Sequence, residues 1–192
     1  RAFLEPRGMV GRVYVSADGI NAQVCGATAD CEAYRHFVAS AFREQQLLFK
    51  EDPVGEPAFP RLRVKHKGLV PALGDAAVDL SRRGVDLSPA EWAAMLADGS
   101  SLKRVLDVRN GYEWDVGRFD GAERPPLQYF HESDEATYGL PPAGARERAE
   151  VPVLLYCTGG VRCEYFSALL RQRGFEKVYK LQGGVQHYAN HF

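Results

Sequence analysis

The most restrictive feature of the sequence is a strand, a glycine loop and a helix that follow one another between residues 151 and 174. Residues 153–156 form a short apolar run of the kind that a parallel strand buried on both faces requires. Cys157 then opens the loop, and the helix that follows ends at Gly174, a common terminator. We therefore expect an α/β fold here, with a parallel sheet flanked by helices.

The same loop predicts a reactive cysteine. The adjacent Gly159 and Gly160 let the backbone curl so that N–H groups point inward, and the helix N-terminus adds its partial positive charge. Arg162 adds a full positive charge at the lip. A thiol in such surroundings ionises readily, and the thiolate is the nucleophilic form. We expect Cys157 to be catalytic. The predicted anion-binding loop consists of Thr158, Gly159, Gly160, Val161, Arg162 and Cys163.

The spacing within the loop separates two kinds of cysteine chemistry. Four residues lie between Cys157 and Arg162. Cysteine-dependent phosphatases have a longer loop, because it must surround a phosphoryl group. The shorter loop suits a smaller reacting atom such as sulfur, so the spacing disfavours a phosphatase.

The other cysteines have less definite roles. Cys163 can either resolve a persulfide by forming an internal disulfide or pack as a small buried hydrophobe. Cys25 and Cys31 are expected to pack. The cysteine spacings match no paired zinc pattern, so we expect neither a metal site nor a cofactor.

Several segments resemble one known family. CTGGVRCE begins at Cys157, DVRNGYEWDVGRFDGA lies upstream and LQGGVQHY downstream, and together they resemble a rhodanese-homology domain. The CTGGVRC form is more narrowly similar to the rhodanese-like tRNA uridine hydroxylase group and its plant and algal relatives. GRVYVSADGINAQVCG, near the start, looks like the N-terminal domain of that group, so the resemblance covers most of the chain.

The resemblance favours an enzyme and leaves three functions open. The first is a rhodanese-type sulfurtransferase that carries sulfur as a persulfide on Cys157 and takes it from a small donor such as thiosulfate or a persulfide. The alternative is hydroxylation of the wobble uridine of tRNA at C5, with the same cysteine and with tRNA as the substrate. The third is a rhodanese domain that binds a partner without catalysis.

We expect two domains joined by a linker. Residues 1–75 form a small α+β domain, which the resemblance makes ferredoxin-like, although an opening strand and helix of that fold are not visible. Residues 76–87 form the linker, and residues 88–192 form the rhodanese-like domain. The latter begins with a capping box of Ser88 and Glu91, with proline at the first helical position.

Within the first domain, a hairpin is expected to turn at Asp18-Gly19, a helix to be capped by Asp30, and a strand to cover residues 47–49. A further strand, residues 61–67, alternates basic with largely apolar residues. Because side chains alternate between the two faces of a strand, four cations lie on the same face: Arg61, Arg63, Lys65 and Lys67. These cations either guard an edge strand against aggregation or contact RNA phosphates.

In the second domain, Asp107 and Arg109 end a buried strand, at the sheet edge where the Cys157 loop also lies. Asp107 is expected to tie loops together. Arg109 is a candidate substrate contact, and its partner is either an anionic substrate or the loop itself. Residues 125–142 include four prolines and are expected to form a loop over the surface, where His131 is either exposed or part of the site.

Composition sets limits rather than a function. The 192 residues carry a net charge of −1, so overall charge does not indicate a nucleic-acid-binding protein. No apolar run approaches a membrane span, no signal peptide is visible, and the cysteines are typical of a reduced compartment. We expect a soluble intracellular protein without a membrane partner, from cytoplasm or chloroplast. The chain begins at Arg1 without methionine, as a fragment or processed form would.

Overall fold

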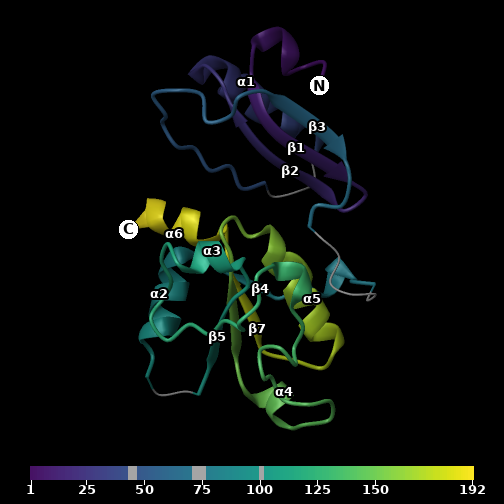
Figure 1. Cartoon of the computed structure of the whole chain (residues 1–192), viewed down its shortest axis with the longest axis vertical. Helices are drawn as coiled ribbons and strands as arrows, with labels where there is room; N and C mark the ends of the chain where they lie inside the picture. Colours follow the sequence, from purple (N-terminus) through teal and green to yellow (C-terminus); the bar gives the residue numbers. More distant parts are fainter. Residues whose placement is uncertain (43–46, 71–76, 100–101) are drawn as a thin grey trace. The chain divides into compact units, whose positions relative to one another are not determined.

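The computed structural model describes residues 1–42, 47–70, 77–99 and 102–192. They form two compact units, Arg1–Leu69 and Val70–Phe192, each with its own sheet and core (Figure 1). The first unit is a small α+β domain and the second is a parallel α/β domain, so the predicted fold class is confirmed.

The first unit is a three-stranded sheet with one long helix. Its elements are η1 (Glu5–Arg7), β1 (Val10–Ser16), β2 (Gly19–Cys25), α1 (Thr28–Ala41) and β3 (Leu62–His66). The strand order is β2-β1-β3; β1 and β2 form the predicted antiparallel hairpin, and β3 runs parallel to β1. Tyr34 and Val38 of α1 pack with Val13 of β1, so α1 covers one face of the sheet.

Two expectations for this unit are wrong. Asp30 is not the helix cap, because α1 begins at Thr28 and the capping position is held by Ala27 without a side-chain hydrogen bond. Asp30 lies instead in the first turn, where its charge suits the positive helix end. Residues 47–49 do not form a strand. Leu47 and Phe49 nevertheless pack against the core, which needs apolar contact but no strand pairing.

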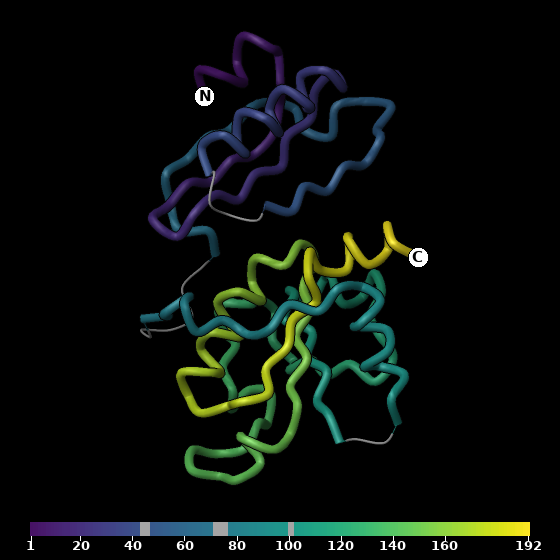
Figure 2. Tube along the Cα trace, turned by 180° about the vertical axis from the view of Figure 1, so that it is seen from behind, coloured from purple at the N-terminus to yellow at the C-terminus, as the bar shows by residue number. Residues whose placement is uncertain are grey.

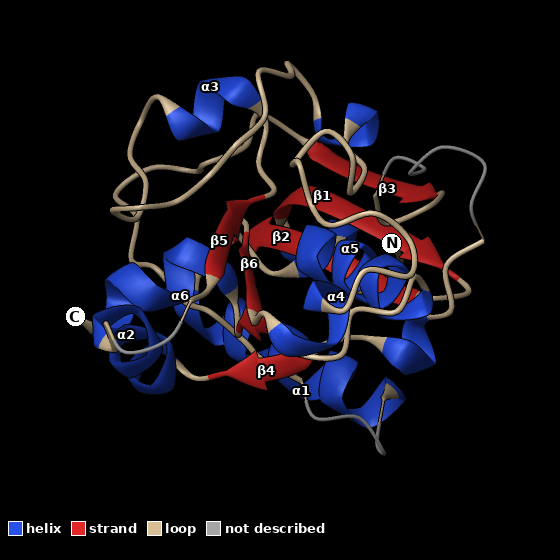
Figure 3. Ribbon diagram, turned by 90° about the horizontal axis from the view of Figure 1, so that it is seen from below, coloured by secondary structure: helices blue, strands red, loops and turns tan. Residues whose placement is uncertain are grey.

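The second unit is a four-stranded parallel sheet, in the order β4-β7-β6-β5, between two layers of helices (Figure 3). Its strands are β4 (Val85–Leu87), β5 (Arg104–Asp107), β6 (Val153–Tyr156) and β7 (Val178–Leu181). Its helices are η2 (Leu80–Arg82), α2 (Pro89–Ala97), α3 (Gly111–Trp114), η3 (Phe130–Glu132), α4 (Glu147–Glu150), α5 (Val161–Gln172) and α6 (Gly184–His191).

The central strand β6 is buried on both faces, as its apolar run predicts. Leu155 packs with Phe166 of α5 on one face, and Leu154 packs with Trp92 of α2 on the other. The trace in Figure 2 passes from β7 directly into α6 at the end of the chain. The predicted capping box at Ser88 and Glu91 starts α2.

The segment expected to be a linker has more structure than the sequence indicated. Val85–Leu87 forms the edge strand β4, which pairs in parallel with β7. Before it, the side chain of Gln172 accepts a hydrogen bond from Asp79 N (3.0 Å) and donates one to Ala77 O (3.1 Å). These contacts with α5 and β7 attach residues 77–87 to the second unit.

The proline-rich stretch 125–142 does not simply lie over the surface, as we had expected. Phe130, Tyr138 and Leu140 are buried, and they pack in the core beside Phe166. Apolar side chains at these three positions anchor the loop, whereas His131 stays exposed and stacks on Tyr129. Within the described residues, no helix is both long and apolar enough to cross a membrane.

Candidate active site

Cys157 lies at the carboxyl end of β6, and residues 158–160 lead from it into α5. Of the predicted loop, Thr158, Gly159 and Gly160 are loop residues, whereas Val161, Arg162 and Cys163 form the first turn of α5. The Gly160 N–H donates a hydrogen bond to Cys157 Sγ (3.1 Å), and Gly160 takes a φ of 99° that favours glycine. The cysteine is only 1% exposed.

The start of α6 supports this loop from the other side. Val185 N donates to Cys157 O (2.9 Å), and Gln186 N donates to Thr158 O (3.2 Å). A Cβ atom at Gly184 would lie 2.4 Å from Cys157 O and 2.5 Å from Thr158 O. Only glycine therefore permits this close approach.

The loop favours the ionised form of Cys157. Burial by itself would raise its pKa, but a side-chain hydrogen bond from Cys163, the charge of Arg162 and the N–H groups of Cys163 and Gly160 outweigh it. Together these groups lower the pKa of Cys157 to about 6. The thiolate is therefore the main form at neutral pH.

Cys163, in contrast, keeps its proton at neutral pH. It is fully buried, and burial together with its hydrogen bond to Cys157 and the charge there raises the pKa of Cys163 well above that of a free thiol. A thiolate and a thiol thus lie in contact. Both earlier interpretations of Cys163, a packing residue and a resolving thiol, are compatible with this position.

Glu113 is a site residue that sequence reasoning missed. Its carboxylate receives two hydrogen bonds from Arg162, both 2.6 Å long, and a third from the Thr158 hydroxyl. Burial would raise the pKa of Glu113, but the bonds from Arg162 and Thr158 outweigh this effect and lower it to about 2. Asn110 and Glu113 form a capping box on α3, and that sequence pattern was the available signal.

Arg109, for which a substrate contact and a contact with the loop were both open, bonds within the loop in this structure. Its guanidinium bonds to both carboxylate oxygens of Asp107 (2.6–3.0 Å) and to Gly117 O (2.5 Å), and its side chain is 6% exposed. The ion pair holds Arg109 in place, so it ties the loop after β5 to the strand. Asp107 thus has the loop-tying role predicted for it.

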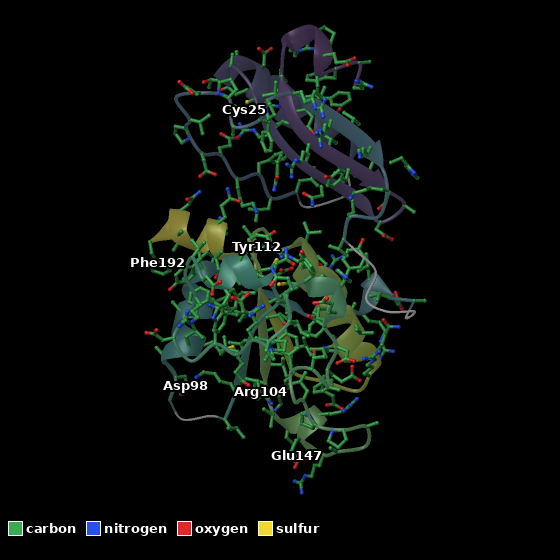
Figure 4. All side chains as sticks on the ribbon, viewed as in Figure 1. Cys25, Asp98, Arg104, Tyr112, Glu147 and Phe192 are labelled. Carbon is green, nitrogen blue, oxygen red and sulfur yellow. The ribbon has the colours of Figure 1, made fainter. Side chains whose placement is uncertain are left out.

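A shallow cleft borders α3, the helix that carries Glu113. It has a volume of about 380 Å³. Its wall includes Tyr112, an exposed aromatic side chain (Figure 4), together with Asp115, Arg124 and Gln128. The cleft offers a stacking surface and hydrogen-bonding groups, and Tyr112 in its wall is the sequence neighbour of Glu113.

The remaining predicted residues belong to the first unit. Arg61, Arg63, Lys65 and Lys67 are all exposed, on or next to β3. Cys25 on β2 (Figure 4) and Cys31 on α1 are partly buried, and Cys31 packs against the core of that unit. Cys31 therefore contributes to packing, as predicted.

The parallel α/β fold and a cysteine loop at a strand end define the class of rhodanese-type domains. Residues 88–191 match the family model described as the rhodanese-like domain, and residues 1–70 match that of the UPF0176 acylphosphatase like domain. The chain therefore belongs to the rhodanese-like family and carries a UPF0176 N-terminal domain, which confirms the resemblance seen in the sequence.

Curated relatives match nearly the whole chain. A protein of Protochlamydia amoebophila named tRNA uridine(34) hydroxylase is 40% identical over 189 residues, which are 98% of this chain and 58% of that protein. A Chlamydia pneumoniae protein of the same name is 39% identical and matches 98% of this chain and 57% of its own length. The chain thus spans less than three-fifths of these relatives.

The fold also resembles solved structures. The solution structure of a rhodanese-like domain from an Anabaena protein is 24% identical in sequence and superposes with a TM-score of 0.42. The match covers 55% of this chain and 73% of that domain.

Proposed function

We propose that this chain is part of a tRNA uridine(34) hydroxylase and that Cys157 is its reactive residue. The observation that carries the proposal is the similarity of about 40% over 98% of the chain, across both units, to proteins of that name. The wobble-uridine hydroxylation that was our alternative hypothesis is therefore better supported than sulfur transfer.

The cysteine pair gives this reaction a source of electrons. Hydroxylation by dioxygen puts one oxygen atom into the C–H bond of the base and releases the other as water, which requires two electrons and two protons. Cys157 and Cys163, which are in hydrogen-bond contact, supply the two electrons when they form a disulfide. The Cys163 thiol releases one of the two protons, and solvent supplies the other. A thiol reductant then restores the pair. Thiolate at Cys157 and thiol at Cys163 are the starting forms that the loop favours.

Sulfur transfer is the second candidate, and the burial of Cys157 favours it. A sulfur atom that is 1% exposed and bonded by a loop N–H suits a small donor. In that reaction the thiolate attacks the outer sulfur of thiosulfate, the S–S bond breaks, sulfite leaves, and Cys157 carries the persulfide.

The remaining alternatives have less support. A phosphatase needs its loop arginine for the substrate phosphate, whereas both terminal nitrogens of Arg162 bond to Glu113. A binding module without catalysis needs no ionised thiol, whereas the surroundings of Cys157 lower its pKa to about 6.

One experiment tests the hydroxylase proposal against sulfur transfer. The purified chain is incubated with unmodified tRNA transcript, a thiol reductant and either air or nitrogen, and the nucleosides are analysed by mass spectrometry. We expect oxygen-dependent gain of one oxygen atom on uridine 34. In parallel, intact mass is measured after thiosulfate treatment. A reducible gain of one sulfur on Cys157, without any hydroxyuridine in air, would replace the hydroxylase proposal with sulfur transfer.

A further inference from the structure

The three-stranded sheet of the first unit has two unlike faces. Val13, Ala22 and Val64 point towards α1 and belong to the core. Because side chains alternate along a strand, the intervening positions point to the opposite face. This outer sheet face consists of Arg12, Tyr14, Asn21, Gln23, Arg61, Arg63, Lys65 and Lys67.

Strand register arranges these side chains in rows. Arg12 on the central strand pairs with Gln23 on one side and Arg63 on the other, and Tyr14 pairs in the same way with Asn21 and Lys65. The ammonium group of Lys67 lies 4.3 Å from the centre of the Tyr14 ring, which holds this charge over the sheet. The face therefore alternates cations with an aromatic ring and side-chain amides.

The charge of this face is not neutralised within it. β1, β2 and β3 contain three of the face's cations, Arg12, Arg63 and Lys65, but no Asp or Glu at any position. Within the described residues, Arg61, Arg63 and Lys65 form no ion pair. Cations elsewhere in the unit do: Arg1 pairs with Glu5 at 2.7 Å, and Arg35 with Glu51 at 3.0 Å.

Protection of a sheet edge does not account for this arrangement. An edge guard needs charge only on an edge strand, here β2 or β3. Arg12 lies on the central strand β1, and Gln23 extends the polar row to β2. The whole face, not only its edge, is therefore suited to a negatively charged partner.

We propose that the outer sheet face binds the sugar-phosphate backbone of tRNA. The inference rests on the proposed function for the choice of RNA as the polyanion. Successive cations on β3 are two residues apart, about 6.6 Å along a strand, which is similar to the separation of neighbouring phosphates in an RNA strand. Asn21 and Gln23 provide donors and acceptors for sugars or base edges, and single-stranded loops expose both.

The test compares two double variants that lose the same charge. Arg63→Gln with Lys65→Gln removes two cations from the outer sheet face. Arg1→Gln with Arg35→Gln removes two that are paired with carboxylates. Binding of unmodified tRNA transcript is measured by fluorescence anisotropy over a range of salt concentrations, after thermal melting has shown that both variants are folded.

We expect the first variant to bind at least 10-fold more weakly at low salt, and the slope of log K against log salt to fall by about 1.4–1.8, or 0.7–0.9 for each lost phosphate contact. The control should bind within about twofold of the unaltered chain, since its cations are already paired. Equal losses in both variants, or none in the first, would overturn the proposal. So would binding of an acidic polypeptide at this face in place of tRNA.

Failure of this inference is distinguishable from failure of the proposed function, because binding is measured without turnover. Selective loss of tRNA binding without any hydroxyuridine from the unaltered chain would support the interface and reject the hydroxylase. Hydroxyuridine formation with tRNA binding unaffected by the Arg63 and Lys65 substitutions would support the hydroxylase and reject the interface.

Discussion

Cys157, which opens the loop, and Cys163, in the first turn of α5, ionise differently because their neighbours differ. Cys157 and Cys163 are both buried, and burial raises the pKa of each. Cys157 receives hydrogen bonds and faces the charge of Arg162, which reverses the effect. Cys163 donates to Cys157, so its proton is retained. The loop therefore prepares one thiolate and one thiol rather than two equivalent groups.

Replacing Cys163 with alanine should raise the pKa of Cys157 above 6, because the variant loses the side-chain hydrogen bond to the thiolate. The N–H groups of residues 160 and 163 remain, so the pKa should stay below that of a free thiol. Ultraviolet thiolate absorbance against pH measures the change, with Cys157→Ser as the blank and Cys31→Ala as the control. An unchanged midpoint would mean that Cys163 does not stabilise the thiolate.

At the scale of elements, Glu113 joins α3 to the cysteine loop. Its pKa falls from an ordinary 4.5 to about 2 in the folded chain. Because the pKa of Glu113 is lower in the folded chain, its carboxylate stabilises the folded state at pH values above about 4.5, the pKa in the unfolded chain. This stability is lost as the pH falls from about 4.5 through about 2. By proton linkage, this pKa shift contributes about 3 kcal/mol to the free energy of unfolding at neutral pH.

Glu113→Gln should therefore lower the free energy of unfolding at neutral pH by about 2–3 kcal/mol, because Arg162 loses its charged partner. The difference from the unaltered chain should shrink as pH falls towards 2. Denaturant unfolding at several pH values measures it. The exposed Glu147 provides the control, Glu147→Gln, which should change stability by less than about 0.5 kcal/mol. A constant difference at all pH values would show that the carboxylate charge is not responsible.

The contact between α6 and the loop gives a second prediction. Gly184→Ala should destabilise the second unit by more than about 2 kcal/mol, since it combines a positive φ with a Cβ clash against the carbonyls of residues 157 and 158. Gly174 also has a positive φ but open space around it, so Gly174→Ala should cost only about 1 kcal/mol. Equal losses of unfolding free energy in the two variants would contradict close approach at Gly184.

Local signals predicted much of this architecture. Periodicity and glycine placement were enough for β6, the cysteine loop and α5, and the capping box at Ser88 marked the start of α2. Contacts between distant residues were not predictable in this way. Arg162 lies 49 residues from Glu113, and Phe130 is buried by tertiary packing within a segment whose prolines indicated a surface loop. Asp30 failed as a cap because the helix starts two residues earlier.

At the scale of the whole molecule, the net charge does not reveal the basic surface of the first unit. The net charge of −1 gives no sign of RNA binding, yet the outer sheet face of the first unit is basic without carboxylates on its strands. The second unit carries the cysteine pair. The two proposals therefore assign RNA binding to one unit and oxidation chemistry to the other, and each can be tested by variants in its own unit.

The division of roles predicts that the electrons come from the cysteine pair. In a single turnover without added reductant, the reduced chain should form one hydroxyuridine for each Cys157–Cys163 disulfide, because disulfide formation releases two electrons. Nucleoside analysis and non-reducing peptide mapping of the same sample measure both products. Hydroxyuridine formed in excess of disulfide, with no reductant present, would assign the electrons to another source.

The most direct test of the central claim compares hydroxyuridine formation by the unaltered chain, Cys157→Ser and Cys25→Ser with unmodified tRNA in air. Cys25 lies in the first unit and is the matched control. The account predicts hydroxylated uridine 34 from the unaltered chain and from Cys25→Ser, and none from Cys157→Ser. Hydroxylation by Cys157→Ser at the rate of the unaltered chain would contradict it.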